Sequence, residues 1–143
     1  MSPLGRSVPS IILVSLAALL SGCDACQDAR DDAVRAWDAV VSHALDVAAE
    51  WGETEVKDSN RGRLGISETA ERERKRWVTG LEKAKRARDA MVTLGPDFMT
   101  VVNQTVEELG TMEPRRANQD WQDKLANAKK AAYLVQTVCR TSK

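Results

Sequence analysis

The sequence predicts an all-α fold: a small antiparallel helical bundle, with three long helices and one short helix, after an N-terminal signal segment. Two observations predict this fold. Alanine, valine and charged residues dominate the 143-residue chain, while 4 Pro and 8 Gly are few, and this composition favours helices. Apolar residues also recur at alternating steps of three and four, the spacing that places them on one face of a helix.

The chain starts with a segment that has the features of a secretory signal. An apolar stretch from Ile11 to Leu20 follows a short segment in which Arg6 is the only charged residue. Charged, apolar and small residues in that order are typical of a cleaved signal peptide. The apolar stretch is shorter than the roughly 20 residues that a membrane-spanning helix needs. The sequence therefore predicts a signal peptide over residues 1–22.

The motif Leu20-Ser21-Gly22-Cys23 closes this segment. It resembles the lipobox of bacterial lipoprotein precursors, in which Leu, a small residue and Gly or Ala precede a Cys. The resemblance implies that the Cys23 thiol takes a diacylglyceryl group, that the chain is cut after Gly22, and that residues 23–26 form a lipidated N-terminus. It places the protein on the bacterial cell membrane or outer membrane, facing the periplasm or the exterior. Asp24 resembles an inner-membrane retention signal of enteric bacteria, which leaves the choice of membrane open.

Residues 27–139 are predicted to form one bundle domain, followed by a C-terminal tail over 140–143. The first helix is expected from Gln27 to Glu50, because Gly52 is a natural terminator after Trp51. Residues 52–66 contain Gly and Asn and are predicted to form a flexible linker.

Three further helices are expected after this linker. The second begins at Ser67, a suitable N-cap, and ends near Leu94, where Gly95-Pro96 interrupts the pattern. The third is short, from Pro96 to Leu109, and Gly110 ends it. The fourth opens at Pro114, since proline suits the first turn, and runs to Val138.

An apolar seam runs along three of these helices and predicts that they pack nearly antiparallel. The second seam is interrupted by Arg88. The third helix, apolar on more than one side, is expected in the core, with a groove-docking or membrane-surface role as the alternative. The seams consist of Trp37, Val41, Ala44, Ala48 and Trp51 in the first helix, Trp77, Leu81, Ala84, Met91 and Leu94 in the second, and Trp121, Leu125, Ala128, Ala132, Val135 and Cys139 in the fourth.

Charge is balanced overall but segregated along the chain. The 21 basic and 21 acidic residues cancel, and removal of Arg6 leaves a net charge of −1, so no basic field indicates a nucleic-acid partner. Residues 24–50 are acidic, whereas 68–94 and 113–143 are basic. We expect these segments to attract one another as neighbours in the bundle. The alternative is a basic surface that faces anionic lipid or polymer.

Two cysteines remain if Cys23 carries lipid. Cys26 precedes the first helix and Cys139 ends the last, and these two points share one end of an up-down bundle of four helices. The compartment outside the cytoplasm is oxidising, so the sequence predicts a disulfide between them. Such a closed loop of about 100 residues stabilises by up to about 4.7 kcal/mol through lost chain entropy. The alternative is two free thiols, with Cys139 as a small core residue.

The mature chain shows no catalytic or metal-binding motif. His43, the only histidine, lies off the seam and is expected to be a solvated helix residue. The sequence thus predicts a protein without enzymatic activity or cofactor: an interaction module of the accessory, inhibitor or immunity/exclusion type, with the membrane and another protein as partners. The alternative is a structural spacer resembling the murein lipoprotein, whose C-terminal lysine, here Lys143, is joined to peptidoglycan. The helix breakers Gly52, Pro96 and Pro114 disagree with one long rod.

Overall fold

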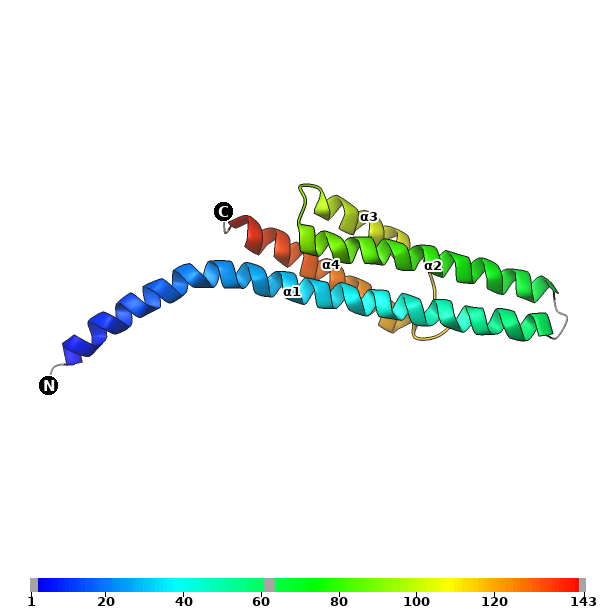
Figure 1. Ribbon diagram of the computed structural model, residues 1–143, viewed down its shortest axis with the longest axis horizontal. Helices are drawn as coiled ribbons and strands as arrows, with labels where there is room; N and C mark the ends of the chain where they lie inside the picture. The colour runs from blue at the N-terminus through cyan, green and yellow to red at the C-terminus, as the bar shows by residue number, and fades with distance from the viewer. Residues whose placement is uncertain (1–2, 61–63, 142–143) are drawn as a thin grey trace.

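The computed structural model describes residues 3–60 and 64–141, which form four helices and no strand (Figure 1). The helices are α1 (Pro3–Asn60), α2 (Leu64–Thr93), α3 (Phe98–Gly110) and α4 (Asn118–Thr141). The predicted all-α helical bundle, with three long helices and one short one, is confirmed.

The helices surround one core in the cyclic order α1, α2, α3, α4. The helix α1 packs against both α2 and α4, and α3 packs against the same two helices from the other side. Residue pairs give the direction of packing: Arg30 and Asp38 of α1 contact Val92 and Arg88 of α2 respectively. A later residue of α1 therefore contacts an earlier residue of α2. The two helices run in opposite directions, as Figure 1 also shows.

Three tryptophans fill the centre of the core and alanines line the rest. Trp37, Trp77 and Trp121 have no exposed surface, and each comes from a different helix. The predicted seam of α4 is buried from Trp121 to Val135, and Cys139 is partly buried. In α2, Ala87 occupies the buried position next to Arg88, so the seam continues, and the Arg88 side chain reaches Asp38 on α1 instead.

The seam of α1 is wider than predicted because this helix has two neighbours. Val40 and Val47 are buried in addition to Ala44 and Ala48, whereas Val41 and Trp51 are only partly buried. A helix that packs between two others must bury a broader stripe than a single three-four seam provides. The short helix α3, in contrast, buries one face through Met99, Val102, Thr105 and Leu109 and exposes the opposite side.

The predicted linker over 52–66 is largely helical. Helix α1 continues through Trp51 and Gly52 to Asn60, and α2 begins at Leu64, ahead of the predicted N-cap Ser67. A glycine inside a helix costs only about 1 kcal/mol relative to alanine, and packing against a second helix can exceed that cost. A Cβ atom at Gly52 would lie 3.5 Å from Cδ of Arg74, which shows how closely α2 approaches at this point.

The remaining boundaries differ less, with one exception. Helix α2 ends next to Leu94, whose φ of 48° turns the chain at the predicted Gly95-Pro96 stop. The prediction that Pro114 opens the fourth helix is wrong, because α4 begins at Asn118. The connection that contains Pro114 contacts α1 through Arg115. The Arg115 guanidinium lies 4.9 Å from the centre of the Trp51 ring and donates a hydrogen bond to Thr54 Oγ1.

The N-terminal part of α1 extends beyond the other helices (Figure 1). The other three helices lie beside the later part of α1. The C-terminal end of α4 and the turn between α2 and α3 are at the same end of the bundle, the end that faces the N-terminal part of α1. Within residues 3–60 and 64–141, no helix combines the length and apolar character that a membrane crossing requires.

Candidate functional site

The end of the bundle nearest the N-terminal segment is closed by the two predicted cysteines. Sγ of Cys26 on α1 and Sγ of Cys139 on α4 lie 2.04 Å apart, a bonding distance, and their Cα atoms are 4.8 Å apart. The structure therefore brings together the two residues that the sequence paired. Because 113 residues separate them in sequence, the bond joins the start and the end of the predicted bundle domain.

Cys23 lies in α1, three residues before Cys26. Its side chain is outside the part of the structure that is described in atomic detail, so its predicted lipid attachment stays a prediction. Lys143, the residue that the spacer alternative would join to peptidoglycan, also lies outside the described residues. The helical backbone from Cys23 to Cys26 nevertheless fixes the spacing between the two cysteines at one turn of α1.

A hollow of about 340 Å³ opens beside the Cys26–Cys139 pair. Cys139 itself forms part of its wall. The turn between α2 and α3 and the last part of α4 supply the rest, through Leu94, Gly95, Pro96, Phe98, Val135, Gln136 and Arg140. This wall is mainly apolar, and it offers Gln136 and Arg140 as its polar side chains.

A second cluster surrounds His43 in the middle of the bundle. The His43 side chain is buried, with 8% of the residue exposed, which corrects the prediction of a solvated histidine. Nζ of Lys124 on α4 lies 3.1 Å from Nδ1 of His43, and Oδ2 of Asp120 lies 3.7 Å from the same nitrogen. The imidazole also tilts against Trp121, with ring centres 5.2 Å apart. Lys124 in turn binds Asp120 at 2.9 Å, so the three polar side chains form one network.

Burial sets the protonation of this network. Desolvation lowers the pKa of His43 below its ordinary value of 6.5, and the positive charge of Lys124 lowers it further. Three carboxylates, of Asp120, Asp46 and Glu50, act in the opposite direction with smaller effects. The hydrogen bond from Lys124 lowers the pKa of Asp120. These effects favour the neutral form of the histidine, whose Nδ1 can then accept a hydrogen bond from the lysine ammonium.

A signal for the burial of His43 was present in the sequence. His43 follows Val40 by three residues and precedes Val47 by four, and both valines are buried. Residues at these spacings share one face of a helix. The predicted seam of α1 contains neither His43 nor these valines, because a single row of three-four steps describes the contact with one neighbouring helix.

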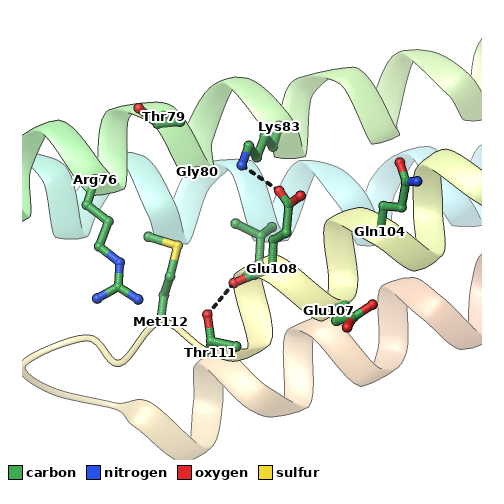
Figure 2. Close-up of a pocket in the computed structure, with 10 residues that line it drawn as sticks. Arg76, Thr79, Gly80, Lys83, Gln104, Glu107, Glu108, Thr111 and Met112 are labelled. Atoms are coloured by element: carbon green, nitrogen blue, oxygen red, sulfur yellow. Dashed lines mark hydrogen bonds and ion pairs between the residues drawn. The ribbon is translucent and has the colours of Figure 1, made fainter.

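A larger hollow than the one beside Cys139 lies between α2 and α3 (Figure 2). It has a volume of about 630 Å³, within the range of small-molecule sites. Gly80 forms part of its floor together with Met112 and Leu109. A Cβ atom at Gly80 would come within 3.1 Å of Leu109 and of Met112, so the absence of a side chain at this residue allows the two segments to approach.

Charged side chains surround this α2–α3 groove. Lys83 on α2 forms an ion pair of 2.5 Å with Glu108 on α3, and Figure 2 shows this pair bridging the two helices. Arg76 and Glu107 also line the groove and are exposed. Because these charges lie at the margin of an apolar floor, the groove can bind a polar or charged segment of another molecule by hydrogen bonds and ion pairs.

Metal-ligating side chains are not grouped together in the described part of the chain. Residues 3–60 and 64–141 contain no group of three or more His, Cys, Asp or Glu side chains that could hold a metal ion. The α2–α3 groove was not predicted, because it depends on how α3 lies on α2. No family model, curated protein or solved structure matches the chain.

Proposed function

We propose that this protein is a lipid-anchored component of the bacterial cell envelope and that its bundle is a non-catalytic protein-interaction module. The observation that carries the proposal is the pairing of Cys26 with Cys139. Disulfides persist in oxidising compartments outside the cytoplasm and are rare within it. The signal-like segment over 1–22 and the lipobox that ends at Cys23 point to the same compartment.

The position of the α2–α3 groove supports an interaction role. Val92 of α2 contacts Arg30 near the Cys26 end, whereas Gly80 lies twelve residues earlier in α2, about 18 Å along the helix axis. A tether at Cys23 would therefore leave the groove away from the attachment point. The groove suits a partner protein that presents charged side chains. The bundle would act on this partner as an accessory subunit, an inhibitor or an immunity/exclusion factor.

A structural spacer resembling the murein lipoprotein is the alternative. The four described helices fold back on one another, whereas a spacer of that kind consists of one long rod. No contact or cluster in the described residues favours the spacer. Muramidase digestion followed by mass spectrometry tests it: a peptidoglycan fragment attached to Lys143 would support the spacer, and a free C-terminal peptide would exclude it.

The anchor is tested by metabolic labelling with radioactive palmitate in a bacterial host. The wild-type protein should take up label and fractionate with membranes, and Cys23→Ser should do neither. Cys26→Ser is the matched control, since it removes a thiol one helical turn away and should still be labelled. A wild-type protein without label, or a Cys23→Ser variant that keeps label and membrane fractionation, would contradict the proposal.

The interaction role is tested by affinity purification from solubilised membranes. A specific partner should be recovered with the wild-type protein and lost with Arg76→Glu, which reverses a charge at the groove. Arg72→Glu makes the same change at an exposed residue of α2 that does not line the groove, and it should retain the partner. Recovery of no specific partner, or equal loss with both variants, would count against the groove as the interaction site.

A further inference from the structure

The end of the bundle that carries the Cys26–Cys139 pair has an apolar surface formed by the turn between α2 and α3. We call it the tether-end surface and define it by Val92, Leu94, Pro96 and Phe98. Val92 is 54% exposed, Pro96 is exposed, and Leu94 and Phe98 are half-buried. Leu94, Pro96 and Phe98 also line the hollow beside Cys139. The wall of this hollow extends to Val135.

We propose that the tether-end surface rests on the phospholipid bilayer and contacts its acyl region. This inference deepens the proposed function and rests on it, because it requires the lipid at Cys23. It adds an orientation: the bundle lies against the membrane with one defined end, and the α2–α3 groove is presented away from it.

The first argument is reach. Cys23 precedes Cys26 by three residues of continuous helix, about 4.5 Å along the axis. Cys26 is bonded to Cys139, and Cys139 lines the same hollow as Leu94 and Phe98. The lipid attachment is thus separated from the tether-end surface by one helical turn and one disulfide. A tether of this kind cannot act as a long flexible linker, so the surface stays close to the acyl chains.

The second argument is chemical. Transfer of apolar side chains from water into hydrocarbon is favourable, and an apolar surface at the membrane boundary gains this free energy. The charges at this end are mixed. Arg30 donates a hydrogen bond to the carbonyl oxygen of Val92, and Arg140 lines the hollow. The exposed acids Asp31 and Asp97 directly follow Arg30 and Pro96 in the sequence. Attraction to anionic lipid is therefore not the driving force, and the contact should form on zwitterionic lipid and depend little on salt.

The experiment uses the lipidated full-length mature protein, with its palmitate content measured first, in phosphatidylcholine vesicles that contain a phospholipid with a photoactivatable diazirine in one acyl chain. After irradiation and digestion, mass spectrometry locates the cross-linked residues. Cross-links should concentrate in residues 92–98. The segment 68–83, which lies nearer the start of α2 and farther from the tether-end surface, should show few. An even distribution along α2, or cross-links concentrated in 68–83, would overturn the inference.

Two substitutions provide a matched pair. Val92→Glu places a charge in the tether-end surface, and Leu45→Glu places one at a side chain of almost equal exposure, 53%, elsewhere on the bundle. Leu45 is nineteen residues beyond Cys26, about 28 Å along α1. Val92→Glu should reduce lipid cross-linking of residues 92–98 about tenfold, the factor that 1.4 kcal/mol represents, and Leu45→Glu should leave it unchanged. Equal effects of the two substitutions would overturn the inference.

The outcomes separate this inference from the proposed anchor. A protein without palmitate contradicts both. A protein that carries palmitate and yet cross-links to lipid evenly, or that cross-links to a second copy of itself through residues 92–98, retains the anchor and loses the membrane-facing surface.

Discussion

The ammonium group of Lys124 lies 3.1 Å from Nδ1 of the buried His43, so a cation on one helix depends on a neutral imidazole on another. Protonation of His43 would place two positive charges at this distance in a partly desolvated site. The carboxylate of Asp120 offsets part of that repulsion, but it already binds Lys124. The contact between α1 and α4 is therefore sensitive to pH at a defined pair of residues.

We expect the stability of the bundle to fall as the pH decreases through 6.5. The pKa of His43 is lowered in the folded protein, whereas the unfolded chain titrates near the ordinary value of 6.5. The unfolded state thus binds more protons in this range, so the contribution of neutral His43 is complete above pH 6.5 and is lost as the pH falls through 6.5 and then through the folded pKa. Urea unfolding followed by tryptophan fluorescence at pH 7.5 and 5.5 measures this difference.

Two variants isolate the cause. His43→Phe should remove the difference between the two pH values that this histidine produces, because it is the only histidine in the chain. Lys124→Gln should reduce the difference, because the lysine charge is one of the causes of the lowered pKa. An NMR titration of His43 with a midpoint at or above 6.5 would contradict the prediction.

The bond between Cys26 and Cys139 should contribute several kcal/mol to stability. The two residues are 113 positions apart, and closure of a loop of roughly 100 residues restricts the unfolded chain by about 4.7 kcal/mol. The double variant Cys26→Ser/Cys139→Ser should therefore unfold at a much lower urea concentration than the oxidised protein. Its midpoint should not change with dithiothreitol, whereas the wild-type midpoint should fall with the reductant. A wild-type midpoint that dithiothreitol leaves unchanged would show that no such bond stabilises the protein.

The juxtaposition of Cys26 and Cys139 could be predicted because it depends on little more than the number of helices. An even number of helices that reverse direction returns the chain to its starting end. The seams of α2 and α4 were predictable for a similar reason, since the spacing of Trp77, Leu81 and Ala84, for example, is a local property of the helix.

Features that depend on two neighbouring helices could not be predicted in the same way. His43 is buried because α1 lies between α2 and α4, and the sequence does not state how many helices each helix contacts. The helix continues through Gly52 because contact with α2 outweighs a small intrinsic penalty. The α2–α3 groove needs the alignment of Gly80 with Met112, which only the packed structure provides.

Two core tryptophans should respond differently to replacement by phenylalanine. Nε1 of Trp121 donates a hydrogen bond of 3.1 Å to the carbonyl oxygen of Leu109, whereas Nε1 of Trp77 is buried and has no partner among the described residues. The two rings contact each other edge to face at 5.0 Å, so both substitutions shrink the same region of the core. A buried unpaired donor costs about 1–3 kcal/mol, and an intact hydrogen bond contributes about 1 kcal/mol.

Trp121→Phe should therefore destabilise the bundle by about 2–4 kcal/mol more than Trp77→Phe does, because only the former loses a bond and only the latter removes an unpaired donor. Urea unfolding of both variants at pH 7.5, monitored by far-UV circular dichroism, gives the two free energies of unfolding. Equal losses, or a larger loss for Trp77→Phe, would show that the shape of the cavity rather than the hydrogen bond determines the cost.

Gly80 should tolerate no large side chain, since its missing Cβ is what lets α3 and Met112 approach α2. A Cβ atom there would lie 3.1 Å from Cδ2 of Leu109 and 3.1 Å from both Sδ and Cε of Met112. Gly80→Leu adds three more carbon atoms to this contact, and overpacking of this kind costs about 1–3 kcal/mol.

Gly110→Leu is the matched control, because nothing lies within 4 Å of the Cβ position at Gly110. The free energy of unfolding should fall in Gly80→Leu and change little in Gly110→Leu. Adding Met112→Ala to Gly80→Leu makes room for the leucine and should recover part of the loss, and a loss that is instead the same with and without Met112→Ala would show that contact with Met112 does not limit this site.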